Sequence, residues 1–179
     1  AGISTPDFTD VPADALLEQL STRLGWAARS VELPAGRYET LLPPSAVADL
    51  LIYAYWTMNG RDADEGRNVF AGKQPGTNRI GEKLTDLPAT LTSGPGLEGL
   101  PCAPFAVITQ PDPGMESVFD NGADVADTAW ITDGVLTQLV RTRHGAAKAG
   151  VDAFPYPAWN LRLDAGGTAT LDEMIAATK

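Results

Sequence analysis

The sequence predicts an α+β fold in which an antiparallel sheet with hairpins is flanked by helices. Two stretches show the helical spacing of apolar residues, and an Asp-Gly pair separates two apolar runs that are typical of strands. No regular alternation of strands and helices, which would indicate a parallel sheet, is visible. The 18 glycines and 14 prolines indicate many turns between short elements.

Two amphipathic helices are predicted in the first third of the chain. The first runs from residue 9 or 10 to about 28, with Asp10 as its cap and Pro12 in its first turn. The second runs over residues 45–60, with a serine as its cap and a glycine at its end. Between them, residues 37–42 are expected to form a short strand that ends at two prolines. The apolar faces consist of Leu16, Leu17, Leu20 and Leu24 in the first helix and of Val47, Leu50, Leu51, Ala54, Tyr55 and Met58 in the second.

The middle of the chain is rich in turn-forming residues. Residues 61–104 have many Gly, Pro, Asn and Thr residues, and they predict a long loop with only brief strand-like pieces. A loop of this length is usually functional or mobile. Residues 105–109 consist of four apolar residues and a threonine, and Pro104 and Pro111 bound them, which predicts a buried strand.

The last third of the chain contains the clearest local signal, a hairpin over residues 130–140. Asp133 and Gly134 supply the positive φ angles that a two-residue hairpin turn needs. A further strand is expected at residues 160–163. Thr170 and the glutamate three residues later form a capping box, which predicts a last helix toward the end of the chain.

Composition excludes several classes of protein. Hydrophobic residues make up 44% of the chain, which suits a folded core, and no apolar run of about 18 residues is present, so a cytoplasmic protein without a membrane span is expected. The net charge of −10 and the scattered basic residues argue against direct binding of nucleic acid. With one cysteine, Cys102, and one histidine, His144, the chain alone cannot build a disulfide or a Cys/His zinc site, and no cofactor is expected.

Two motifs have catalytic interpretations that the surrounding sequence does not favour. Residues 94–99 match the dinucleotide pattern G-x-G-x-x-G, but prolines follow where a helix should begin, which favours a plain turn. His144 could act as a base for Ser93 or Ser117, yet no G-x-S-x-G sequence accompanies it. A hydrolase that uses His144 or Cys102 in another arrangement is kept as an alternative.

Two exposed positions are candidates for binding a peptide or a partner protein. Trp56 lies partly off the apolar face of the second helix, so it either packs beneath the long loop or belongs to an aromatic contact surface. His144 stands in the basic stretch of residues 141–144, which is more typical of a surface or partner contact than of catalysis.

Several short segments occur in a fixed order between residues 36 and 167. These segments are residues 36–46, 47–58 with Gly60, 70–72 with Gly76, 108–113, 117–120, 128–139, 146–150, and 160–161 with 166–167. No single segment is specific, but in this order and spacing they resemble the TldD/PmbA family, whose members were named as modulators of DNA gyrase and are described as peptidases or peptidase subunits.

The resemblance implies a division of the chain. Residues 1–35 are expected to form an N-terminal helix and linker, and residues 36–179 a TldD/PmbA-like C-terminal domain that is incomplete at its C-terminal end. The chain would then be an interior to C-terminal piece of a longer protein.

The resemblance also implies the type of subunit. The catalytic branch of the family carries His-Glu-x-x-x-His on the helix at residues 45–59, which places two zinc-binding imidazoles and a general base on one helical face. Here residues 51–56 read Leu-Ile-Tyr-Ala-Tyr-Trp and offer no ligand. A noncatalytic PmbA-type subunit, inactive alone, is therefore expected. Such a subunit pairs with a metal-bearing TldD-type partner to act on unfolded or modified small peptides. A homo-oligomer, or a self-associating structural domain without activity, is the alternative.

Asp120 is the third candidate for a peptide or partner contact. Relatives tend to read Phe-Asp-Asp-Glu-Gly where this chain reads Phe119-Asp120-Asn121-Gly122-Ala123. The role of this loop is therefore expected to differ from that in the relatives.

Overall fold

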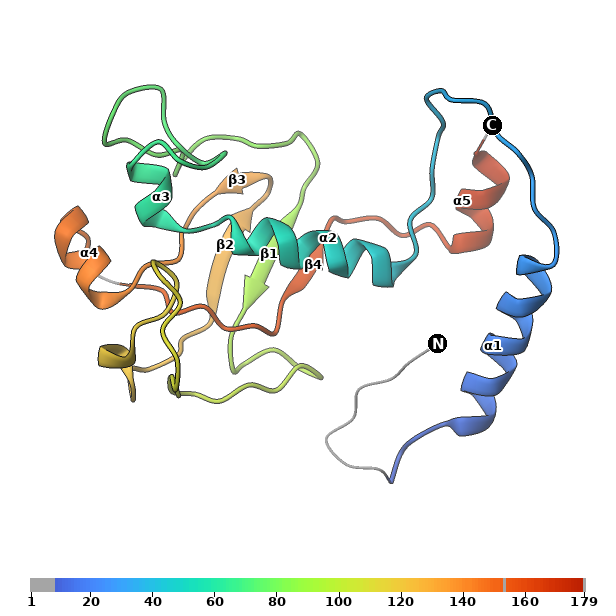
Figure 1. Ribbon diagram of the computed structural model, residues 1–179, viewed down its shortest axis with the longest axis horizontal. Helices are drawn as coiled ribbons and strands as arrows, with labels where there is room; N and C mark the ends of the chain where they lie inside the picture. Colours follow the sequence, from blue (N-terminus) through green and yellow to red (C-terminus); the bar gives the residue numbers. More distant parts are fainter. Residues whose placement is uncertain (1–8, 153, 179) are drawn as a thin grey trace. The chain divides into compact units, whose positions relative to one another are not determined.

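The computed structural model describes residues 9–152 and 154–178, and the chain divides into a unit that ends at Glu39 and a unit that begins at Thr40 (Figure 1). The boundary expected from the sequence lay between residues 35 and 36. Lys179, toward which the last helix was expected to run, lies outside the described residues. Among the described residues, no helix has both the length and the apolar character needed to cross a membrane.

The first unit contains one helix, α1 (Ala13–Ala27), among its described residues. Its leucine side chains at positions 17, 20 and 24 are exposed, and none of its residues is buried. The predicted cap, Asp10, is wrong: the cap is Pro12, because the helix begins two residues later than an Asp10 cap requires. Residues 37–42, predicted as a strand, form none; this run crosses the boundary between the two units.

The helix predicted at residues 45–60 is α2 (Pro44–Trp56), which ends four residues earlier than predicted, and a short helix, α3 (Gly60–Asp64), follows it. Pro43 is the cap of α2 and Pro44 its first residue, so the predicted serine cap is wrong. Asn59 begins α3: its side-chain oxygen accepts a hydrogen bond from the Asp62 amide at 3.2 Å and so caps this helix.

The remaining helices are shorter. They are the 3-10 helix η1 (Val118–Asp120), α4 (Arg143–Ala149) and α5 (Leu171–Ala177). The capping box that predicted α5 is confirmed. The sequence analysis missed α4, although Thr142 caps it by accepting from the Gly145 amide and Gly150 ends it with φ of 69°.

Four short antiparallel strands form one sheet in the order β3-β2-β1-β4, so the predicted α+β class is confirmed. The strands are β1 (Thr90–Ser93), β2 (Thr128–Thr132), β3 (Val135–Leu136) and β4 (Arg162–Asp164). The predicted hairpin turn is confirmed, with φ of 48° at Asp133 and 78° at Gly134. The predicted long loop of residues 61–104 contains β1 and most of α3. Strand β4 lies at one edge of the sheet, and all three of its residues are exposed.

The main core lies where α2 crosses one face of the sheet (Figure 1). Tyr55 of α2 meets Trp130 of β2 edge-on, with 5.1 Å between ring centroids, and both side chains are fully buried. The indole of Trp130 donates to the Ser93 hydroxyl at 2.8 Å, so its polar atom is satisfied inside the core.

A second, smaller core forms around the segment predicted as a buried strand, residues 105–109. Ala106 and Ile108 are buried together with Ala123, whereas Phe105 and Val107 are exposed. Only Phe105 forms a β-bridge, to Asp124. The prediction of a buried strand is therefore wrong: alternate side chains of this extended segment face the core and a surface groove.

Candidate functional site

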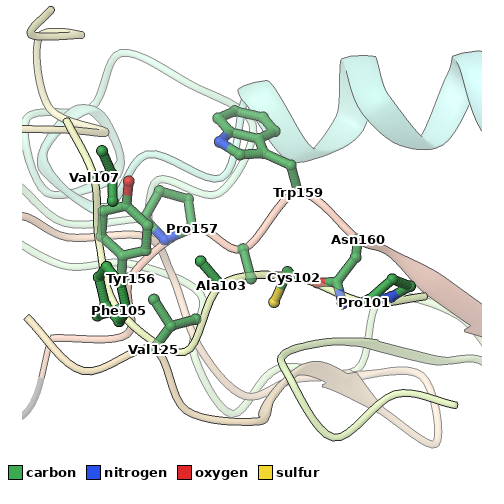
Figure 2. A pocket seen from close by; sticks show the side chains of 11 residues that line it. Pro101, Cys102, Ala103, Phe105, Val107, Val125, Tyr156, Pro157, Trp159 and Asn160 are labelled. Carbon is green, nitrogen blue, oxygen red and sulfur yellow. The ribbon is translucent and has the colours of Figure 1, made fainter. Parts of the chain in front are cut away.

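An apolar groove of about 400 Å³ lies between two extended segments of the second unit (Figure 2). It is lined by residues 101–103, Phe105, Val107 and Val125 on one side and by residues 156–160 on the other. Figure 2 shows Phe105, Val107 and Tyr156 gathered at one end, with Cys102, Asn160 and Pro101 at the other. We call this cavity the apolar groove.

The alternation of residues 103–108 builds one wall of the apolar groove. Ala103, Phe105 and Val107 line it, while the intervening Ala106 and Ile108 anchor the segment in the small core. Phe105 and Val107 keep 51% and 66% of their surface exposed, so the groove offers apolar surface to a ligand.

One carboxylate holds the aromatic side chains of the other wall. The Tyr156 hydroxyl donates to Glu116 Oε1 at 2.8 Å, and the Trp159 indole nitrogen donates to the same oxygen at 3.4 Å. Burial, the hydrogen bond to Glu116 and its negative charge together raise the pKa of Tyr156 well above the ordinary range. Tyr156 therefore stays a neutral donor, and the two rings are fixed in place.

Helix α2 supports the floor of the apolar groove. The Tyr55 hydroxyl donates to the carbonyl of Ala158 at 3.2 Å, and its ring meets Trp159 edge-on at 5.4 Å between centroids. Burial raises the pKa of Tyr55 well above its usual range, and the smaller effect of a hydrogen bond with Ser93 opposes this shift. The groove is thus tied directly to the main core.

Asn160 closes one end of the groove by holding the glycine-rich segment. Its amide nitrogen donates to the carbonyls of Gly94 and Leu100, and its oxygen accepts from the Gly94 amide. A Cβ atom at Gly94 would lie 2.3 Å from Asp127, so this close approach requires glycine. The G-x-G-x-x-G match is followed by no helix and forms a turn, as the sequence favoured.

A second cavity, of about 510 Å³, lies between α3, α4 and neighbouring turns. We call it the charged pocket. Its lining residues are Arg61, Asp64, Glu65, Gly76, Asn78, Gly114, Arg141, Thr142, His144, Gly145, Lys148, Ala149 and Val151.

A buried ion pair forms part of the lining of the charged pocket. Arg141, with a side chain only 5% exposed, donates from both terminal nitrogens to Asp64 at 2.6 and 3.1 Å. Asn78 donates to the same carboxylate at 2.7 Å. A Cβ atom at Gly60 would lie 2.8 Å from the guanidinium carbon, so glycine makes room for Arg141.

The structure places the three sequence-predicted contact residues in different surroundings. Trp56 is half exposed and meets Tyr53 edge-on at 5.1 Å, but it lines neither the apolar groove nor the charged pocket. His144 lines the charged pocket. Asp120 is buried and accepts from the Arg143 amide at 3.0 Å, which fixes the start of the helix that carries His144.

In the loop that was expected to differ from that of the relatives, Asn121 holds the neighbouring segment in place. Asn121 accepts from the Ile108 amide at 2.6 Å and donates to the Ile108 carbonyl at 2.8 Å. Only an amide side chain supplies both the donor and the acceptor, so an aspartate could not replace it here.

The groups of the alternative hydrolase are not brought together. Cys102 lines the apolar groove, whereas His144 lines the charged pocket. Ser93 accepts from Trp130, and the Ser117 hydroxyl accepts from the Phe119 amide at 3.3 Å. In the described part of the chain, no hydrogen bond joins His144 to either serine.

The zinc site of the catalytic branch does not fit the residues of α2. Along residues 51–56, Tyr55 is buried in the core, Leu51 packs against it, and Ile52, Tyr53 and Trp56 are exposed. None of these side chains carries an imidazole, thiolate or carboxylate. Throughout residues 9–152 and 154–178, no group of three or more His, Cys, Asp or Glu side chains is placed to hold a metal ion.

The sequence analysis missed the residues that shape the apolar groove, above all Glu116, Tyr156 and Trp159. The sequence feature that could have indicated Tyr156 and Trp159 is the aromatic, proline-rich segment of residues 154–159, whose composition is unusual for a solvated loop. Its partner Glu116 had no local signal, because the contact joins residues 40 positions apart.

Comparison with known proteins identifies an α+β domain of a peptidase family. The model of the PmbA/TldA metallopeptidase C-terminal domain matches residues 35–179. The chain therefore belongs to this family, and the resemblance seen in the sequence is confirmed. No curated protein sequence matched the chain.

Two solved structures share the fold. One, from Bacteroides thetaiotaomicron, is named a candidate modulator of DNA gyrase; it has a TM-score of 0.66 and 20% identity over 93% of this chain and 33% of its own. The other, from Thermotoga maritima and named in the same way, has a TM-score of 0.61 and 20% identity over 82% of this chain and 31% of its own. The chain thus spans about a third of the length of these relatives.

Proposed function

We propose that this chain is part of a metal-free, PmbA-type subunit that presents peptides to a metal-bearing TldD-type partner. The subunit binds unfolded or modified small peptides in the apolar groove, and the partner supplies the hydrolytic metal site. Family membership supports a metallopeptidase-related role, and the two observations below support the finer assignment.

The observation that carries the proposal is the composition of α2 at the position of the family's zinc motif. Its side chains either build the core or expose apolar and aromatic surface. Peptide hydrolysis by a zinc enzyme needs a metal that polarises the carbonyl and lowers the pKa of bound water. Residues 51–56 provide no ligand for such a metal.

The apolar groove supports the peptide-binding part of the proposal. Its walls include the exposed apolar and aromatic side chains of Phe105, Val107 and Trp159, which can accept many different residues, as a subunit acting on varied peptides requires. Asn160 lies at one end of the groove, and the chain continues from it into β4, which is an exposed edge strand. An extended peptide could pair with such an edge through its backbone, independently of its sequence.

The test measures binding and cleavage of a labelled unfolded peptide by the purified protein with its metal-bearing partner. Phe105→Ala should weaken peptide binding about fivefold, since it removes roughly 1 kcal/mol of apolar contact. Cleavage at low peptide concentration should fall in the same proportion.

Phe119→Ala is the matched control for Phe105→Ala. Phe119 is 89% exposed and does not line the apolar groove, so its removal should leave binding and cleavage unchanged. Equal affinities of the wild-type protein and Phe105→Ala for the peptide would argue against the groove as the binding site.

A further inference from the structure

We infer that the charged pocket binds a carboxylate group of the peptide whose chain lies in the apolar groove. This inference rests on the proposed function and adds to it a polar specificity site. Three observations lead to it: the charge balance of the pocket, the two side chains in its lining that have no bonded partner among the described residues, and the turn that lies between the pocket and the groove.

The charge balance of the pocket is opposite in sign to that of the whole chain. Three permanent cations, Arg61, Arg141 and Lys148, line it with two acids, Asp64 and Glu65, which leaves one positive charge with His144 neutral. The chain as a whole carries −10. A local positive site in an acidic protein attracts an anion to that site in preference to the rest of the surface.

The two acids of the pocket are already engaged. Asp64 accepts hydrogen bonds from Arg141 and Asn78. Glu65 pairs with Arg61 at 3.0 Å and with Arg67 at 2.5 Å, and Arg67 also pairs with Asp62. The nearby charge of Lys148 contributes to the lowered pKa of Glu65, behind the larger effect of the hydrogen bond from Arg61.

Lys148 and His144 are left without a bonded partner in the part of the chain that the structure describes. Both are exposed on α4, four residues apart and therefore on the same helical face, and both line the charged pocket. An ammonium and an imidazole in this arrangement can each donate to one carboxylate.

One tight turn connects the charged pocket to the apolar groove. Asp112 and Glu116 form a β-bridge, and the turn between them includes Gly114. Glu116 holds Tyr156 and Trp159 of the groove, while Gly114 lines the pocket. Since these two residues are only two positions apart, their Cα atoms lie within about 7.6 Å, a span of two residues of an extended peptide. The inference therefore places the peptide chain in the groove and its carboxylate, from a terminal residue or an acidic side chain, in the pocket on the other side of this turn.

The first experiment compares one peptide as the free acid and as its C-terminal amide, by fluorescence anisotropy at low salt. The wild-type protein should bind the acid about threefold to fivefold more tightly, in keeping with one or two exposed ion pairs. Lys148→Gln with His144→Gln should reduce this ratio to about 1, and Lys148→Glu should make the amide the tighter ligand.

Lys83→Gln is the matched control, because Lys83 is exposed and pairs with Asp86 away from both cavities. It should leave the acid-to-amide ratio unchanged. Phe105→Ala should weaken both forms equally, which separates the groove from the pocket. The inference is overturned if the wild-type protein prefers neither the acid over the amide nor Glu over Gln in the amidated peptides described below, or if the preference it shows is unaltered in Lys148→Glu.

Further peptides identify the source of the carboxylate. Amidated peptides with a single Glu or the matching Gln report on acidic side chains, and the acid and amide pair reports on the C-terminus. A preference in either pair that disappears in Lys148→Glu supports the inference and names the group that is bound.

A direct probe tests the charged pocket even if no peptide binds in the groove. N-acetylglycine, but not N-acetylglycinamide, should shift the amide resonances of Gly145 and Lys148 in the wild-type protein. The shifts should be absent in Lys148→Glu. If N-acetylglycine causes no shift in the wild-type protein, the inference is wrong, whatever the outcome for the proposed function.

Discussion

The buried pair of Arg141 and Asp64 is the residue-scale interaction on which the charged pocket depends. Asp64→Asn should lower the free energy of unfolding by about 2–3 kcal/mol at pH 7, because Arg141 would keep its charge in a buried position beside a neutral group. Urea denaturation measures this loss. Asp86→Asn is the control, since that fully exposed carboxylate should contribute less than about 0.5 kcal/mol.

The same variant should change the acid dependence of stability. Partial burial acts to raise the pKa of Asp64, but hydrogen bonds from Arg141 and Asn78 and the charge of Arg141 outweigh it and hold the pKa below its ordinary value. A carboxylate with a lowered pKa contributes stability above its unfolded pKa of about 3.9 and loses it as the pH falls through the folded value. The difference in the free energy of unfolding between the wild-type protein and Asp64→Asn should therefore shrink below about pH 4. A difference that grows on acidification would contradict this account.

Helix α2 is the element that ties the apolar groove to the core, through the hydroxyl of Tyr55. Tyr55→Phe would leave the buried carbonyl of Ala158 without its donor, so it should lower the free energy of unfolding by about 1–2 kcal/mol. It should also weaken peptide binding, because the segment that carries Trp159 loses the hydrogen bond that holds its backbone against α2. Thermal unfolding and peptide affinity are the measurements.

Tyr53→Phe is the matched control for Tyr55→Phe, since Tyr53 is on the same helix and 64% exposed. It should change the free energy of unfolding by less than about 0.5 kcal/mol.

The contribution of Tyr55 to stability should also depend on pH. Because its pKa is raised in the folded protein, this contribution is complete below the unfolded pKa of about 10 and is lost as the pH rises above it. The difference between the wild-type protein and Tyr55→Phe should therefore narrow above about pH 10.

Three elements whose signals are local were predicted correctly from the sequence, whereas the short helix α4 was missed despite its local caps. The Asp133-Gly134 hairpin, most of α2 and the capping box of α5 each depend on residues within a few positions of one another. The strand expected at residues 37–42 failed, because a strand also requires a neighbour in the sheet, and apolar alternation alone does not specify one.

The candidate site could be predicted only in part, because its contacts join distant segments. His144 was selected from its basic surroundings, and it does line a cavity. Glu116 and Trp159 were missed, since their contact spans 43 residues. Asp120 was selected as a peptide or partner contact; in the structure its carboxylate is buried and fixes the start of α4. No local pattern distinguishes a buried aspartate of this kind from an exposed one.

At the scale of the whole molecule, the chain belongs to a metallopeptidase family, and residues 51–56 of its helix α2 carry no side chain that could bind zinc. The account therefore assigns binding to this chain and metal-dependent cleavage to a partner.

The most direct test of this claim is the zinc content of the purified protein, determined by mass spectrometry together with peptide hydrolysis by the protein alone. The account predicts substoichiometric zinc and no hydrolysis, with hydrolysis restored when a metal-bearing TldD-type partner is added. One zinc ion per chain together with chelator-sensitive hydrolysis in the absence of a partner would contradict it.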